Sequence, residues 1–296
     1  MVNRIQDTAG DRIFYRVNAI LLTLLTLSVL YPIIYVLANS FSSPAAVSSG
    51  RVYLWPLDPS VEGYRRVLEN PNILSGFLNS VFYTVVGTAI NLAMTMVAAY
   101  PMARKALPLR SFFSVLFAFT MLFGGGMIPN YILIMKLGML NTRWALLLPG
   151  ALSVYNMIIA RTAMQSLPDE LLEAAYIDGC SDARYFVRIV LPLSGATIAV
   201  LALYYAVGHW NSYFSAFMYL SDRSKYPLQI VLREILIMGQ IAESDITDLD
   251  SAERIQGLSQ LLKYALIVIS SAPMMLIYPF VQKYFVKGVM IGSLKG

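Results

Sequence analysis

A short polar stretch near the middle of the chain contains the residues whose types and spacing could do chemistry. Seven of them stand at defined intervals: Glu173, Ala174, Ala175, Gly179, Ile189, Leu191 and Pro192. A carboxylate beside two small side chains presents one charge on a surface that a partner can approach closely. The pattern therefore indicates a docking contact with another protein.

Helix signals surround these residues. Pro168 suits the first turn of a helix, because its missing N–H has no intrahelical partner there. Gly179 supplies the left-handed conformation that ends a helix, and Ser181 or Asp182 can cap the next one. The spacing predicts a helix–glycine–helix hairpin over residues 168–192, with arms about 15 Å long at about 1.5 Å per residue. On these signals alone, an amphipathic surface hairpin without a partner explains the stretch equally well.

The composition is that of a membrane protein. Of the 296 residues, 57% are hydrophobic and only 13% are charged, whereas soluble domains average about 25% charged residues. The net charge of +5 comes without any Lys/Arg-rich run, so it does not indicate a nucleic-acid partner. A single cysteine excludes an internal disulfide.

Apolar runs long enough to cross a bilayer, about 20 residues each, recur along the chain. They predict an all-α membrane protein with one domain over residues 1–296 and six transmembrane helices, at about 17–38, 77–100, 111–135, 144–160, 193–220 and 262–285. The first run exceeds the apolar core of a signal peptide, about 7–15 residues, so we expect it to remain as an uncleaved span.

The distribution of basic residues predicts the orientation. The short loop between the second and third spans carries three of them, at positions 104, 105 and 110. Because short cytoplasmic loops are enriched in Lys and Arg, we expect both termini and the hairpin on the cytoplasmic side.

The predicted spans carry almost no ionisable side chain, with His209 as the exception. Ion-coupled carriers place such groups within the bilayer as relays, so this pattern argues against that class. No Gly-x-x-x-x-Gly-Lys-Ser/Thr loop occurs either, which predicts that any ATP is hydrolysed by another subunit. No metal-spaced cluster or nucleophile motif indicates an enzyme, so we expect no catalytic residues and no metal site.

Two polar groups are candidates for lining a pathway through the membrane. Asn130 and Tyr131 follow a Gly/Pro break at 124–129, which is either a kink or span end, or the wall of a wet cavity. The second group combines aromatic rings and amide donors that suit a sugar: His209, Trp210, Asn211 and Tyr213. Its alternatives are an interfacial aromatic belt or a histidine that packs between helices.

The seven spaced residues of the hairpin meet every specified position of the EAA loop, which is found in permeases of binding-protein-dependent ABC importers. Nearly the whole chain resembles the carbohydrate branch of that family, the relatives of the maltose permeases. Strings of the sequence that look like one branch of it stand at 123–129, 141–145, 208–212 and 226–229. That branch handles oligosaccharides, and alginate or another acidic oligosaccharide is a substrate that the resemblance suggests.

The resemblance implies a type I ABC importer permease fold in the bacterial cytoplasmic (inner) membrane. It also implies the partners: a second, similar permease subunit, two ATPase subunits that receive the hairpin, and an extracytoplasmic sugar-binding protein. That binding protein is expected to deliver sugar onto the polar segments at 39–76 and 221–261, and the tail at 287–296 to reach toward the ATPases. The chain itself is expected to bind no cofactor, with ATP and Mg²⁺ held by the ATPases. The rival functions are an ion-coupled secondary sugar carrier and a non-transporting scaffold or exporter component, in which the EAA pattern would be chance.

Overall fold

The computed structural model describes the backbone of residues 8–244 and 249–293, and the side chains of residues 8–237, 257–279 and 282. Within these ranges every regular element is a helix, which confirms the all-α class. The chain divides into two compact units, residues 1–70 with 234–271 and residues 71–233 with 272–296. Each unit is described on its own below.

The first unit begins with α1 (Ala9–Ser40), the first expected span. A capping box starts the helix, because Thr8 and Asp11 bond to each other's backbone N–H groups. The 18-residue apolar window of α1 is not buried by the rest of the chain. An apolar helix of this length with exposed side chains is suited to lipid contact.

Short helices follow α1. They are α2 (Pro44–Ser48) and α3 (Glu62–Glu69). The Ser40 and Tyr64 hydroxyls lie 2.8 Å apart and join the end of α1 to α3. Within the same unit, α15 (Leu249–Ser293) places Leu261 against Gly63, and this helix contains the sixth expected span.

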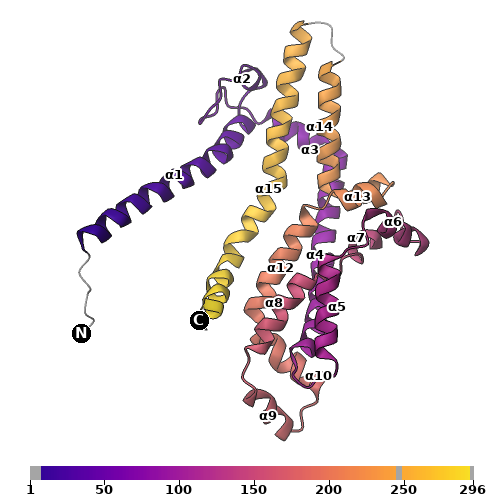
Figure 1. Cartoon of the computed structure of the whole chain (residues 1–296). Helices are drawn as coiled ribbons and strands as arrows, with labels where there is room; N and C mark the ends of the chain where they lie inside the picture. Colours follow the sequence, from indigo (N-terminus) through magenta and orange to yellow (C-terminus); the bar gives the residue numbers. More distant parts are fainter. Residues whose placement is uncertain (1–7, 245–248, 294–296) are drawn as a thin grey trace. The chain divides into compact units, whose positions relative to one another are not determined.

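The second unit is built around α4 (Pro71–Ala103), which contains the second expected span and packs against α8 (Val154–Gln165) and α12 (Gly195–Trp210) (Figure 1). Polar contacts fix these helices in register. Asn91 donates to the carbonyls of Gly150 and Ala151, at 2.9 Å each. Because buried polar groups must be paired, such bonds specify one arrangement of the helices.

The expected third span, residues 111–135, consists of α5 (Arg110–Leu122) and α6 (Met127–Lys136). The two helices are bent by 108° relative to each other. Gly126 at the break has a φ of +84°, which favours glycine. The interruption at the glycine run is therefore confirmed, whereas a single continuous helix is not formed.

The expected fourth span, residues 144–160, is the prediction that the structure corrects most. A single turn, α7 (Trp144–Leu147), is separated from α8 by Pro149 and by Gly150, whose φ is +80°. The prediction of one helix was wrong because the apolar run conceals these turn residues. The helical part also ends five residues later than expected, at Gln165.

The expected fifth span, residues 193–220, likewise divides into α12 and α13 (Phe214–Tyr219). The segment at 221–261, expected only to be polar, contains η2 (Arg223–Lys225), α14 (Leu228–Ser244) and the start of α15. Among the residues that the structure describes, three helices are long and apolar enough to cross a membrane, or up to five if each bent pair forms one span.

Candidate coupling site

The hairpin at 168–192 begins with α9 (Glu170–Ile177). The helix ends in a Schellman motif: the N–H of Cys180 donates to the Ala175 carbonyl at 2.8 Å, and that of Gly179 to the Tyr176 carbonyl at 3.0 Å. Gly179 has the left-handed φ of +69° that this motif requires. The predicted role of Gly179 as the bend is confirmed.

The second arm differs from the uniform helix that the sequence predicts. Ser181 caps α10 (Asp182–Tyr185) by accepting from the N–H of Arg184, which decides between the two capping candidates. A π-helical segment, η1 (Phe186–Val190), then leads into α11 (Leu191–Leu193). The arm ends one residue beyond Pro192 and bends by 79° into α12.

Apolar contacts hold one face of the hairpin against the membrane helices. The buried side chains of Ala175, Tyr185 and Val190 share a cluster with residues of α4, α8 and α12. Ile189, Leu191 and the half-buried Cys180 pack on the same cluster. The hairpin therefore moves with these helices, because displacing it would open closely packed apolar surface to water.

A single arginine at the end of α4 adds a polar attachment. Arg104 donates to the Tyr176 hydroxyl at 2.7 Å and lies 3.6 Å from a carboxylate oxygen of Asp182. Tyr176 in turn donates to that same oxygen at 2.8 Å. The guanidinium also lies within 6 Å of three tyrosine rings, those of Tyr100, Tyr176 and Tyr185, which is cation–π range. This Arg104 cage joins α4 to both arms of the hairpin.

The neighbouring lysine forms a second attachment. Lys105 Nζ lies 2.7 Å from Asp169 Oδ2, just before α9. The hydrogen bond and charge of Lys105 lower the pKa of Asp169 below its usual range, so the carboxylate stays ionised at neutral pH. Both side chains are well exposed, and the pair orients the hairpin more than it stabilises the fold.

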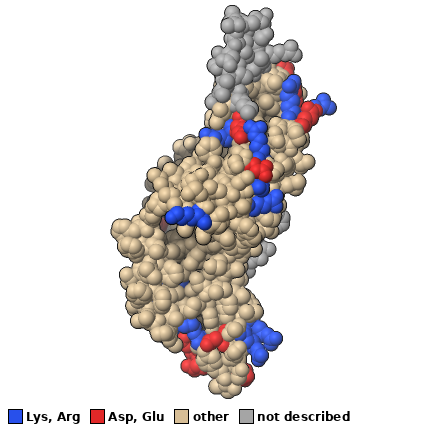
Figure 2. All heavy atoms as spheres, turned by 90° about the vertical axis from the view of Figure 1, so that its right-hand side faces the viewer, with Lys and Arg blue, Asp and Glu red and all other residues tan. Residues whose placement is uncertain are grey.

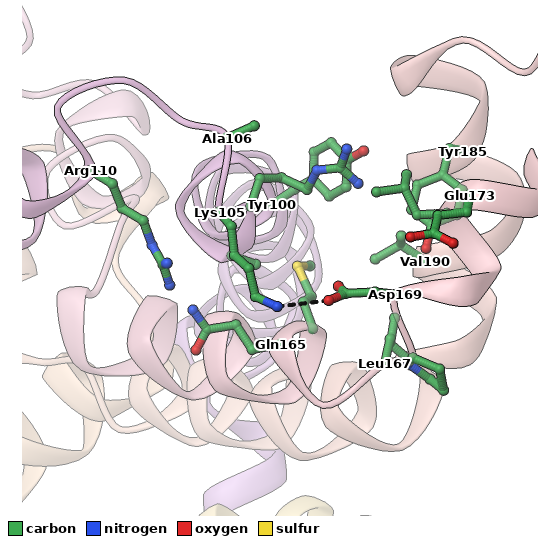
Figure 3. A pocket seen from close by; sticks show the side chains of 15 residues that line it. Tyr100, Lys105, Ala106, Arg110, Gln165, Leu167, Asp169, Glu173, Tyr185 and Val190 are labelled. Atoms are coloured by element: carbon green, nitrogen blue, oxygen red, sulfur yellow. Dashed lines mark hydrogen bonds and ion pairs between the residues drawn. The ribbon is translucent and has the colours of Figure 1, made fainter. Parts of the chain in front are cut away.

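Between these attachments lies a cavity of about 610 Å³ (Figure 3). Arg110 and Gln165 lie on one side of it, and Glu173 and Tyr185 lie on the other. Figure 2 shows acidic and basic side chains gathered at this end of the second unit, beside a broad surface that carries almost none.

The outer face of α9 is open. Ala174 and Glu173 are exposed, and Ile177 is 87% exposed although it is a large apolar residue. Among the described residues, Glu173 makes no ion pair or hydrogen bond with another side chain. An unpaired carboxylate, an exposed isoleucine and the small Ala174 therefore lie together at the surface of α9.

The seven residues of the spaced pattern therefore divide by position. Ala175, Ile189 and Leu191 attach the hairpin to the helices, Gly179 makes the bend, and Glu173, Ala174 and the exposed Pro192 lie at the surface. Sequence reasoning missed Arg104 and Asp182 as attachments. The position of Arg104 directly after a span was visible, but two of its three tyrosine partners, Tyr176 and Tyr185, lie more than 70 residues further on.

The candidate pathway residues do not form one cluster. Asn130 is exposed on α6, where the ring of Tyr131 stacks on that of Tyr219 with centroids 6.1 Å apart. Asn211 and Tyr213 are exposed in the break after α12. These residues remain candidates for contact with a transported molecule.

His209 and Trp210 lie in the contact between α12 and α4. The Nε2 atom of His209 lies 2.6 Å from Asn91 Oδ1. The amide nitrogen of Asn91 already donates to two carbonyls, so its oxygen faces the ring and accepts a hydrogen bond from the Nε2–H group. The buried Trp210 meets Phe77 edge to face, with ring centroids 5.7 Å apart. The structure shows a packing contact for both, and a pathway role stays a prediction.

The described residues contain no group of three or more His, Cys, Asp or Glu side chains that could hold a metal ion. Long apolar helices that carry a charged hairpin at one end define an all-α membrane protein. The chain belongs to the family of binding-protein-dependent transport system inner membrane components, whose sequence model matches residues 4–291.

Several relatives are similar over nearly their whole length. Protein LplC of Bacillus subtilis (strain 168) is 40% identical over 295 residues, covering 100% of this chain and 99% of the relative. The polygalacturonan/rhamnogalacturonan transport system permease protein YtcP of the same strain is 41% identical over 265 residues, covering 90% and 92%.

A solved structure agrees with the fold. It is a chain from the crystal structure of a bacterial ABC transporter involved in the import of the acidic polysaccharide alginate. The two chains are 34% identical with a TM-score of 0.85, over 95% of this chain and 99% of the other. The resemblance to permeases of sugar ABC importers is confirmed.

Proposed function

We propose that the chain is the membrane-spanning permease subunit of an ATP-driven importer, and that it translocates oligosaccharide delivered by an extracytoplasmic binding protein. The observation that carries the proposal is the hairpin: its inner face is fixed to α4, α8 and α12, while Glu173, Ala174 and Ile177 remain open. A hairpin built in this way transmits force between a partner and the membrane helices.

The partner at the hairpin is an ATPase subunit. Exposed Ala174 lets its surface approach closely, Ile177 enters an apolar recess, and Glu173 makes a charge-assisted bond to a basic group. When two ATPase subunits close on ATP and Mg²⁺, their motion reaches α4 through the Arg104 cage. The cavity of the permease pair then opens to the other side of the membrane, since ATP binds the two states with different affinity.

Family membership supports the remaining assembly that we propose. A second, similar permease subunit pairs with this chain, and an extracytoplasmic binding protein delivers the sugar. The chain binds no cofactor of its own, and it has both termini on the cytoplasmic side of the bacterial inner membrane. Parts of the segment at 221–261 and the tail at 287–296, where we place contacts with the binding protein and the ATPases, lie outside the described side chains.

The substrate class is an acidic oligosaccharide. One relative is named for polygalacturonan and rhamnogalacturonan transport, and the solved neighbour comes from an alginate importer. Exposed residues of this chain that could contact the sugar are Asn130, Tyr131, Asn211 and Tyr213. Family membership favours this importer over the ion-coupled carrier, because members depend on a binding protein.

The test is to co-express the chain with the neighbouring genes, purify it and measure ATPase activity in liposomes. We expect a stable complex whose ATP hydrolysis rises when one binding protein is added with alginate or pectin fragments. Transport by the chain alone, driven by an ion gradient, would instead establish the carrier.

A further inference from the structure

Two arginines converge beside the coupling site. Arg110 is the first residue of α5 and donates to the Met102 carbonyl at 3.1 Å, while Arg161 on α8 donates to the Ser114 hydroxyl at 3.2 Å. With its amide oxygen turned toward them, Gln165 accepts from Arg161 Nε at 3.3 Å and also from Arg110. Both guanidinium groups therefore share one neutral acceptor.

Their positive charges are not compensated within the part of the chain that the structure describes. The nearby Arg104 and Lys105 face Asp182 and Asp169, but the ion pairs of the described residues include neither Arg110 nor Arg161. Two like charges held together repel each other, and an anion between or beside them removes that cost. The arrangement has the charge of an anion-binding site.

Space for an anion lies next to the pair. Arg110 and Gln165 line the cavity of about 610 Å³ (Figure 3), which is within the usual range for small-molecule sites, about 300–1,000 Å³. The same cavity carries Lys105, already paired with Asp169, and the carboxylate of Glu173 lies on its side opposite Arg110.

The position of Arg110 identifies the source of the anion. Arg110 begins the apolar helix α5, which has no buried residue, and the side chain of Phe112 in its first turn is 60% exposed. A basic side chain at the end of such a helix lies at the bilayer surface, where lipid phosphates are concentrated. A guanidinium also matches phosphate oxygens with two parallel hydrogen bonds.

We propose that Arg110, Arg161 and Gln165 bind the phosphate of an anionic phospholipid headgroup. The lipid bridges the start of α5 and the end of α8 beside the hairpin. Anionic lipid is thereby a structural component of the coupling end of the subunit.

The experiment uses the purified complex of permease and ATPase subunits in nanodiscs with equal amounts of phosphatidylglycerol and phosphatidylcholine. Native mass spectrometry after detergent extraction counts the retained lipids. We expect wild type to retain phosphatidylglycerol selectively, and Arg110→Gln or Arg161→Gln to lower that selectivity about tenfold, since each removes a charge-assisted bond. Arg110→Lys keeps the charge but loses the two parallel hydrogen bonds of a guanidinium. Its selectivity should therefore lie between those of wild type and Arg110→Gln.

Lys105→Gln is the matched control, because it removes one charge from the same cavity and leaves the arginine pair intact. Equal loss of selectivity in Lys105→Gln would overturn the proposal, because a general positive field would then explain lipid retention. Unchanged lipid with loss of the ATPase subunit in Arg110→Gln would assign the pair to a protein carboxylate. If inorganic phosphate replaced the lipid and bound as often as the lipid does in wild type, the arginine pair would be a site for a free anion.

Discussion

The guanidinium of Arg104 donates a hydrogen bond of 2.7 Å to the hydroxyl of Tyr176, and this contact connects the end of α4 with the first arm of the coupling hairpin. The Tyr176 hydroxyl in turn donates to the carboxylate of Asp182, which belongs to the second arm. The helix that carries much of the packing in the second unit thus holds both sides of the glycine bend. Paired polar groups as well as apolar packing therefore attach the hairpin to α4.

Replacing Tyr176 with phenylalanine should weaken this coupling while the protein still inserts. The variant removes one hydroxyl that both accepts from Arg104 and donates to Asp182. A hydrogen bond to a charged group contributes about 1.5–3 kcal/mol, so we expect transport per ATP hydrolysed to fall by roughly tenfold. Parallel assays of sugar uptake and ATP hydrolysis in proteoliposomes measure that ratio. Tyr155→Phe, at an exposed tyrosine of α8, is the control; an unchanged ratio in Tyr176→Phe would show that the cage does not transmit force.

Substituting Gly179 should disturb the hairpin through its backbone. A Cβ added there meets no atom within 4 Å, but the φ of +69° is unfavourable for other residues by about 1–2 kcal/mol. We therefore expect Gly179→Ala to lower transport severalfold and Gly179→Asp to abolish it, with normal amounts in the membrane. Gly195→Ala provides the control, since that site is equally open but lacks the positive φ. Similar losses in both alanine variants would contradict the strain argument.

The hairpin could be predicted from sequence because its signals are local. A glycine with positive φ and a serine cap act within a few residues, and both appear where expected, at Gly179 and Ser181. The π-helical segment at 186–190 has no such signal. The Arg104 cage was also invisible, because its partners come together only when α4 packs against the hairpin.

The membrane helices show the same limit. Hydrophobicity located the apolar runs but not the turn inside residues 144–160, where Pro149 and Gly150 separate α7 from α8. The polar cluster on the fifth span was one group in the sequence, yet its members separate in space. His209 and Trp210 pack on α4, whereas Asn211 and Tyr213 follow the end of α12.

Glu173→Lys should abolish transport without affecting insertion. Glu173 is exposed and has no ion pair among the described residues, so the change breaks no ion pair within the part of the subunit that the structure describes. A lysine would meet the basic group that we place on the ATPase, and like charges at an interface oppose binding. Co-purification with the ATPase and sugar uptake are the two measurements. Glu170→Lys, an exposed acid in the same first turn but outside the spaced pattern, should retain most activity; equal loss in both variants would mean that only overall charge matters.

The contact between Gly87 and His209 predicts how tightly α4 and α12 are held together. A Cβ on Gly87 would lie 2.5 Å from His209 Cε1 and 2.8 Å from Cδ2, far inside normal contact distance. Gly87→Ala should therefore destabilise the subunit by about 1–3 kcal/mol, as overpacking does. The imidazole cannot simply turn away without losing its bond to Asn91.

A double variant tests this contact directly. His209→Ala alone loses the bond to Asn91, but when it is combined with Gly87→Ala the new methyl group finds space. Because neighbouring substitutions couple, the double variant should lose less free energy of unfolding than the two single variants lose together. Thermal unfolding of the four purified proteins completes the cycle. Additive losses would show that the two residues do not touch. The contact between α4 and α12 described above would then be wrong.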